Sequence, residues 1–258
     1  YIAAINIESV YYSLMGGNYQ PFEGICLTDT FQMYERDDLV GELLVDNSGR
    51  RKRQKKLDIR VIFGNPPYSV GQKSENDNND NLSYPFLDGR IRETYVKKSS
   101  QSIGKKSIYD SYIRAIRWAS DRIGKGGVIG YISGSSFIEK FAMDGMRRSL
   151  ADEFTSIHVV NLRGDIRKNM LSKGLAKEGG NVFESGSMTG IAISIFVKNP
   201  SAKESGRIFY HDIGDDLSSE EKLDRLSELG SIFGINHLPV GWTQIIPDRH
   251  GDWLKQRN

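Results

Sequence analysis

The sequence contains a single cysteine, Cys26, and no long apolar run. One cysteine excludes an internal disulfide and a cysteine-rich zinc site, and it fits a reducing, cytoplasmic compartment. Cys26 itself is expected to be a small buried residue in a strand. No stretch approaches the roughly 20 apolar residues of a transmembrane helix, and no signal-peptide pattern is present. These absences predict a globular protein without a membrane span.

A large excess of one charge is also absent, since 35 basic and 33 acidic residues leave a net charge of +2. This balance is too small to indicate a nucleic-acid partner by itself. The basic residues are nevertheless gathered in the run Arg50–Lys56, after an acidic N-terminal part. The run is interpreted either as a contact to a phosphate backbone or as a solvated loop before a strand.

The most informative stretch runs from Ile59 to Tyr68. Residues 59–63 form an apolar, β-branched and aromatic run of strand length, which ends abruptly at Gly64. The two prolines that follow Asn65 have fixed φ angles and hold the preceding residues extended. The sequence therefore predicts a rigid turn at the carboxyl end of a strand, where ligands bind in open α/β sheets.

The chemistry suited to this turn is recognition of a planar amino group. The side-chain carbonyl of Asn65 and the backbone carbonyl of Pro66 are two acceptors that can take both hydrogens of an NH₂ group. Tyr68 offers an aromatic face on which a base can stack. The alternative is a tight turn that arose by chance and binds nothing.

The tetrapeptide Asn65-Pro66-Pro67-Tyr68 matches the (Asn/Asp/Ser)-Pro-Pro-(Tyr/Phe) motif of amino-group methyltransferases that use S-adenosylmethionine. Three longer phrases resemble the adenine-N6 DNA methyltransferase region of large, single-chain type ISP restriction–modification enzymes: Arg60–Gln72, Tyr109–Ala115 and Tyr210–Asp215. The likeness covers most of the chain. The tetrapeptide alone is shared with protein-glutamine methyltransferases, which remain an alternative, as does a non-catalytic DNA-binding module.

The resemblance implies a cofactor, a substrate and roles for individual residues. It implies S-adenosylmethionine as cofactor, double-stranded DNA with an extruded adenine as substrate, no metal, and further nuclease, helicase-like and target-recognition domains in the same chain. The residues it implies are the catalytic Asn65, Pro66, Pro67 and Tyr68, with Asn65 also against the cofactor and Tyr68 also against the base.

Two further contacts follow from the resemblance. Asp29, in the phrase Thr28-Asp29-Thr30 at the end of a predicted strand, is expected to approach the adenine of the cofactor; alternatively it caps the next turn. Phe183 is expected to be a second contact to the target base, because the family places an aromatic residue before that strand. A core or loop-anchoring phenylalanine is the alternative.

The family needs a glycine-rich turn after its first strand and an acid ending its second, and neither occurs before Asp29. By the family's order, Tyr1 falls just after the second strand, and the first two strands are expected upstream. The resemblance divides the chain into residues 1–200, a methyltransferase catalytic domain without its first strands, and residues 201–258, an extension towards a target-recognition region downstream of Asn258.

The resemblance implies a Rossmann-like, doubly wound α/β sheet with an antiparallel last strand, and the patterning agrees. Because no helix fits between the strands 157–162 and 190–197, they are expected to pair as an antiparallel hairpin at the sheet edge. A polar loop is expected over 69–106, where it closes over the target strand. Expected helices cover 1–14, 107–123 and 139–151, and expected strands cover 23–31, 59–63, 128–133 and 207–210. Ser107 and Asp110 are expected to cap the helix 107–123 as a pair. A further helix is expected to be capped by Ser218 or Ser219, with Lys222 on its solvated face.

Overall fold

The computed structural model describes residues 2–31, 45–67, 84–100, 107–183 and 187–254. The contacts between residues divide the chain into two compact units, Tyr1–Asp58 and Ile59–Asn258. Strands from both sides of residue 200, where the sequence predicts a domain boundary, lie in the second unit.

The described part of the first unit, residues 2–31 and 45–58, contains the helices α1 (Ile2–Met15) and α2 (Val45–Lys56). The predicted N-terminal helix is thus confirmed, and α1 has no buried residue. The predicted run Arg50–Lys56 belongs to the last turns of α2, where cations interact favourably with the helix dipole. The run is therefore helical and not a loop, although Lys52, Arg53, Lys55 and Lys56 are exposed as the solvated interpretation expects. Its contact to phosphate stays a prediction.

The predicted strand at 23–31 is wrong, because side chains of α2 take the place of a neighbouring strand. Leu27 donates its N–H to Asn47 Oδ1 (2.7 Å), and its carbonyl accepts from Asn47 Nδ2 (2.9 Å). The half-buried Cys26 donates its S–H to Gln54 Oε1 (3.0 Å). Burial raises the pKa of this thiol. The segment is thus held to the helix without a ladder of backbone hydrogen bonds.

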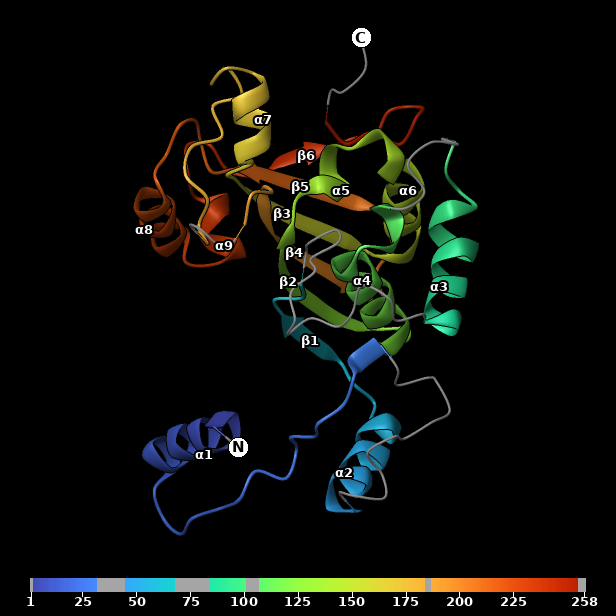
Figure 1. The fold of residues 1–258 in the computed structure, drawn as a ribbon, viewed down its shortest axis with the longest axis vertical. Helices are drawn as coiled ribbons and strands as arrows, with labels where there is room; N and C mark the ends of the chain where they lie inside the picture. The colour runs from blue at the N-terminus through green and yellow to red at the C-terminus, as the bar shows by residue number, and fades with distance from the viewer. Residues whose placement is uncertain (1, 32–44, 68–83, 101–106, 184–186, 255–258) are drawn as a thin grey trace. The chain divides into compact units, whose positions relative to one another are not determined.

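In the described part of the second unit, six strands form one mixed sheet in the order β1-β2-β4-β3-β5-β6 (Figure 1). Parallel pairs join β1 to β2 and β3 to β5, whereas β4 runs antiparallel to both β2 and β3. The predicted α/β class with a reversed strand is confirmed. The strands are β1 (Val61–Gly64), β2 (Gly127–Gly134), β3 (Ser156–Arg163), β4 (Ile191–Lys198), β5 (Arg207–Asp212) and β6 (Thr243–Ile245), the last antiparallel to β5.

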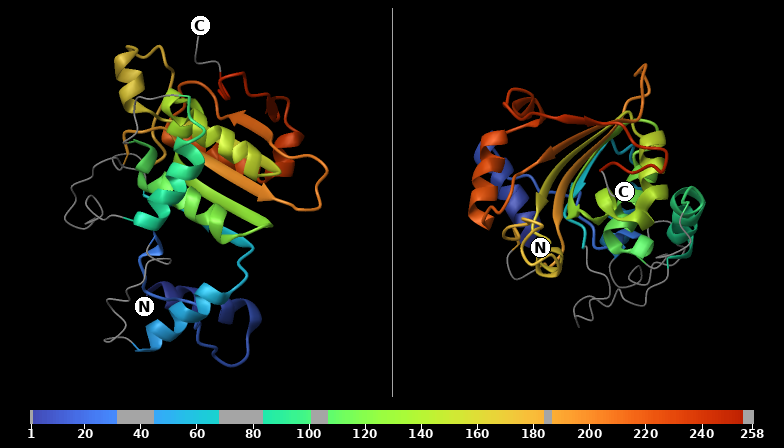
Figure 2. Two further views of the ribbon diagram at one scale, coloured as in Figure 1. Left: turned by 90° about the vertical axis from the view of Figure 1, so that its right-hand side faces the viewer. Right: turned by 90° about the horizontal axis from the view of Figure 1, so that it is seen from above.

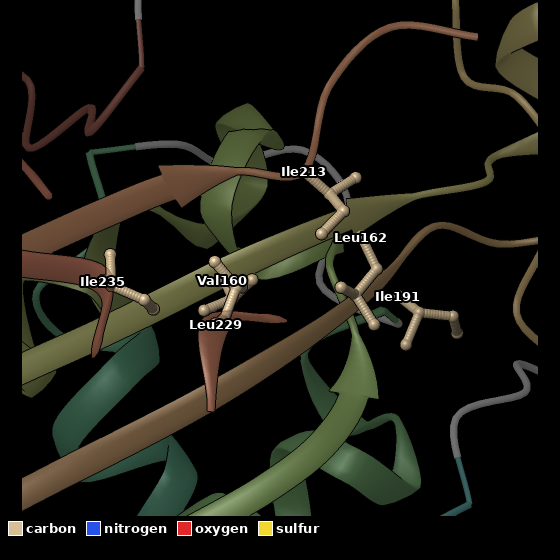
Figure 3. Close-up of a cluster of buried hydrophobic side chains, with 6 residues drawn as sticks. All are labelled: Val160, Leu162, Ile191, Ile213, Leu229 and Ile235. Atoms are coloured by element: carbon tan, nitrogen blue, oxygen red, sulfur yellow. The ribbon is translucent and has the colours of Figure 1, made fainter. Parts of the chain in front are cut away.

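Helices cover both faces of this sheet, as Figure 2 shows in its right-hand view. One face carries α3 (Pro85–Ile91), α4 (Ser111–Arg122), α5 (Ser136–Glu139) and α6 (Asp144–Glu153), and the other carries α8 (Ser219–Leu229) and α9 (Ile232–Asn236). Alternate side chains of β4 serve the two layers. Phe196 packs with Phe137 and Phe154 on the first face, and Ile191 joins the cluster under α8 and α9 on the second (Figure 3).

The predicted pairing of 157–162 with 190–197 is confirmed, but two parts of the hairpin prediction are wrong. β4 does not lie at the sheet edge, because β2 pairs with its other side along all eight residues from Gly127 to Gly134. β3 is also interior, since β5 pairs with it. Between the two strands the chain forms the short helix α7 (Ile166–Leu171).

The predicted loop at 69–106 contains regular structure. The described part holds α3 and a π-helical turn, Arg92–Val96, while residues 69–83 and 101–106 lie outside the described residues. The segment from Tyr84 to the π-helical turn buries residues that recur at helical spacing, namely Tyr84, Leu87, Ile91 and Tyr95.

The next helices also depart in detail from the predictions. A 3-10 turn occupies Ser107–Tyr109 before α4, and Asp110 is its N-cap residue without a side-chain cap, so the predicted capping pair is wrong. The predicted helix at 139–151 begins later, as α6, after a second 3-10 turn at Phe141–Met143. By contrast, Ser218 caps α8 through a reciprocal capping box with Glu221, as predicted.

Two buried arginines tie distant segments of the second unit together. Arg117 donates to Glu153 (2.6 Å) and Asp121 (2.7 Å) and so joins α4 to α6. Arg147 is fully buried, bonds the Asp252 carboxylate (2.5 Å), and donates to the carbonyls of Phe137, Lys140 and Gly251. The segment around Asp252 is thereby anchored on α6.

Candidate active site at the carboxyl edge of the sheet

Strand β1 places the predicted Asn-Pro-Pro turn directly at its end. The strand is in register with β2, with Gly64 opposite Tyr131, and residues 65–67 follow without a break. Asn65 and Pro67 are exposed and Pro66 is half-buried. The predicted strand and its position before the turn are thus confirmed, whereas Tyr68 lies outside the described residues.

The strand directions bring several chain segments to the same edge as Asn65. The strands β1, β2, β3 and β5 run in the same direction, and β4 runs against them. The carboxyl ends of these four strands therefore lie at one edge of the sheet. β2 ends there at Gly134, β3 at Arg163 and β5 at Asp212, while β4 begins there at Ile191. The segment that leads into β4, including Phe183, therefore shares this edge with the turn.

The backbone of Phe183 is held by the buried Asn181. The Asn181 side chain accepts the Phe183 N–H (3.0 Å) and donates to the carbonyls of Gly164 and Thr189 (2.9 Å each). Phe183 is 37% exposed, so the alternative of a core phenylalanine is wrong. Asn181 was missed from sequence, although an Asn two residues before an aromatic fits a local side-chain-to-backbone turn.

A buried lysine of α8 binds the backbone of the segment that leads to Phe183. Lys222 of α8 is fully buried and donates to the carbonyls of Glu178 (2.9 Å) and Gly180 (2.5 Å). Desolvation lowers the pKa of this amine, while the nearby Glu178 opposes that shift. The prediction that Lys222 is solvated is therefore wrong, because two carbonyls replace its water.

The loop around Gly179 lies close to the start of α8, and the glycine is what allows this approach. Its φ is +65°, and a Cβ there would come 2.2 Å from the carbonyl oxygen of Leu217. The loop can lie against the start of α8 only where a side chain is missing. Glu178 continues the arrangement, because its carboxylate accepts from the Asp165 N–H (3.2 Å) and pairs with Lys168 (3.0 Å).

Asp29 belongs to the first unit. Its Oδ1 accepts the N–H of Phe31 at 3.0 Å, which is the geometry of a turn cap. The structure thus supports the turn-capping alternative, and a contact to the cofactor remains a prediction.

Within the described ranges, no group of three or more His, Cys, Asp or Glu side chains is placed to hold a metal ion. None of the helices seen in those ranges has the length and apolar character to cross a membrane.

Comparisons with family models and with curated proteins give no match. Solved structures do match over the whole chain. The ATP-dependent type ISP restriction–modification enzyme LlaBIII bound to DNA shares 46% identity, with a TM-score of 0.89. A nuclease-deletion mutant of the type ISP enzyme LlaGI, in complex with a DNA substrate mimic, shares 46% with a TM-score of 0.88. A DrdV–DNA complex shares 35% with a TM-score of 0.83.

This chain spans a minor part of those proteins: 17% of the LlaBIII chain, 20% of the LlaGI chain and 24% of the DrdV chain. The predicted resemblance is confirmed by these matches.

Proposed function

Because the chain is related over its whole length to a segment of type ISP restriction–modification enzymes, we propose that it is part of the catalytic domain of an adenine-N6 DNA methyltransferase. The observation that carries the proposal is the Asn65-Pro66-Pro67 turn. It follows β1 directly, at the edge where four strands of the sheet end. In α/β sheets this edge is the usual place for a ligand.

The proposed reaction begins with an adenine that has left the duplex, at a cost of a few kcal/mol in lost stacking. Its N6 hydrogens are then accepted by the Asn65 side-chain carbonyl and the Pro66 backbone carbonyl. This pairing draws the nitrogen lone pair out of conjugation and aims it at the methyl donor. Positioning carries most of the acceleration, since a sulfonium is a good leaving group.

The residue types present fit S-adenosylmethionine. Bound there, it supplies an electrophilic methyl group. In this proposal the carboxylate of Asp29 would accept a hydrogen bond from the amino group of the cofactor's adenine, and Asn65 would contact the cofactor on the methyl side. In this proposal Tyr68 stacks on the target base and Phe183 makes a second contact to it.

Duplex DNA is the proposed partner of the whole protein, and the longer relatives LlaBIII, LlaGI and DrdV are DNA complexes. Nuclease, helicase-like and target-recognition domains of the same chain are proposed to accompany this segment in a cytoplasmic restriction–modification enzyme.

Product analysis with the intact protein tests the proposal. Methyl-labelled S-adenosylmethionine is supplied with duplex DNA or with glutamine-containing peptides, and the modified nucleosides or residues are identified by mass spectrometry. We expect N6-methyladenine and no labelled peptide. Methylglutamine as the product would favour the protein-methyltransferase alternative, and labelling of neither would favour a non-catalytic DNA-binding module.

A further inference from the structure

A projection rich in basic residues stands at the same edge of the sheet as Asn65. It consists of residues 166–177, which form α7 and the turns after it, and it is here named the α7 projection. Figures 1 and 2 show α7, drawn in yellow, standing away from the sheet. The projection leaves the end of β3 and returns to the segment that carries Phe183.

Large apolar side chains lie at the surface of this projection. Leu171 is 88% exposed, Leu175 84% and Met170 68%. These three exposed residues lie within six positions of the chain. Exposed apolar surface of this kind marks interaction sites where it is contiguous.

The charge of the projection has one sign. Residues 166–177 include Arg167, Lys168, Lys173 and Lys177 and no acidic residue. Two of these cations form ion pairs at the surface: Lys168 pairs with Glu139 (2.9 Å) and Glu178 (3.0 Å), and Lys177 pairs with Asp215 (2.9 Å). Arg167 and Lys173 are exposed, and both lie beside the apolar residues in the sequence.

Hydrogen bonds hold the projection in one conformation. Asp165 caps α7 by accepting the Lys168 N–H (2.8 Å), and Gly174 donates its N–H to the Asn169 carbonyl (2.8 Å). At the C-terminal end of the projection, the Lys177 carbonyl accepts hydrogen bonds from Arg163 Nη1 and from the Asp216 N–H (3.1 Å each). The exposed side chains are therefore presented by an ordered backbone, which lowers the entropy lost on binding.

We propose that the α7 projection docks on duplex DNA beside the target adenine, with Arg167 and Lys173 against phosphates and Leu171 and Leu175 as an apolar wedge in the base stack. This inference rests on one part of the proposed function, the binding of duplex DNA with an extruded base, and not on methyl transfer. The cations Arg167 and Lys173 suit a phosphate backbone, and leucine is among the side chains that proteins insert between base steps. The wedge fills space left by the extruded base and so favours the extruded state.

The test uses the intact protein, without S-adenosylmethionine, and two double variants. The wedge variant is Leu171→Ala with Leu175→Ala, and its control is Leu223→Ala, at an exposed leucine of α8. The cation variant is Arg167→Ala with Lys173→Ala. Its control is Lys203→Ala, at an exposed lysine between β4 and β5, at the opposite edge of the sheet.

Two measurements separate the roles. For the cation variant, the slope of log K against log salt for DNA binding should fall by about 1.8, or 0.9 for each lost phosphate contact. For the wedge variant, fluorescence of 2-aminopurine at the target position should report at least about tenfold less extrusion with an unchanged salt slope, and a mismatch at the target should restore it, because a mispaired base is extruded at lower cost.

Variants that match their controls in both measurements would overturn the inference. So would unchanged DNA binding combined with altered protease resistance of the intact protein, which would assign the patch to another protein surface. Neither measurement requires methyl transfer. A parent protein that extrudes the base but does not methylate it would therefore refute the proposed function and leave this inference standing.

Discussion

Replacing the buried Lys222 by methionine should loosen the segment that carries Phe183. Methionine keeps the aliphatic volume of lysine but cannot donate a hydrogen bond. The carbonyl of Glu178 still accepts from the Gly164 N–H (3.0 Å), whereas the carbonyl of Gly180 loses the donor that Lys222 supplies. Hydrogen bonds to charged groups contribute roughly 1.5–3 kcal/mol each, and relief from burying the ammonium offsets part of the loss. The net destabilisation should be about 2–3 kcal/mol, which corresponds to a roughly 30- to 150-fold larger local opening constant.

Hydrogen exchange measured by mass spectrometry would detect this change. The amides of Gly164 and Phe183, which bond to Glu178 and Asn181, should exchange faster by that factor, and amides in β2 should not. Lys203→Met, at an exposed lysine, serves as the matched control. If Lys222→Met left the exchange of both amides within about threefold of the parent, the supporting role would be refuted, because threefold is only about 0.7 kcal/mol.

Three further changes have defined outcomes. Burial holds the pKa of His158 below its usual value, so the unfolded state binds more protons than the folded state as pH falls below about 6.5. The parent protein should therefore lose more stability between pH 7.5 and 5.5 than the variant His158→Phe. An equal pH dependence of the two unfolding temperatures would contradict this. Arg147→Ala breaks a buried ion pair and should cost about 3–5 kcal/mol in denaturant unfolding, whereas Arg148→Ala, at a residue that bonds an exposed backbone carbonyl, should cost about 1 kcal/mol or less. Tyr68→Ala should weaken capture of an extruded 2-aminopurine and Tyr68→Phe should not, because the ring face and not the hydroxyl is proposed to act; equal behaviour of the two would count against stacking.

The elements that sequence predicted best are those with a strong local signal. Val61–Gly64, Gly127–Gly134 and Ser156–Arg163 are strands close to the predicted bounds, because each is a short apolar run ended by polar or glycine residues. The cap of α8 at Ser218 was also readable, since a serine followed three residues later by Glu221 is a capping-box pattern.

The position of β4 in the sheet could not be predicted from local signals. Its pairing with β3 follows from the chain connection, but its insertion beside β2 depends on residues more than fifty positions away. By contrast, α3 and the following turn carried a readable signal that the polar segment around them concealed: Tyr84, Leu87, Ile91 and Tyr95 recur at helical spacing.

The candidate site was readable where backbone chemistry defined it and hidden where tertiary contacts did. The prolines after Asn65 fixed the turn, and its position at the end of β1 followed from the apolar run before it. Lys222 has the residue type of a solvated helix face, and its burial depends on a loop that wraps over α8. Asp29 was assigned to a strand end that does not exist, because Asn47 takes the backbone bonds of Leu27.

The measurement that tests the central claim most directly is the rate of N6-methyladenine formation by Asn65→Ala in the intact protein, together with its affinity for DNA. The carbonyl of Asn65 is one of two proposed acceptors on N6, whereas affinity comes mostly from phosphate contacts. We expect methylation to be abolished while DNA binding stays within a few-fold of the parent. Methylation at more than about a tenth of the parental rate, a loss of only ~1.4 kcal/mol of transition-state stabilisation, would contradict the proposed role of the turn.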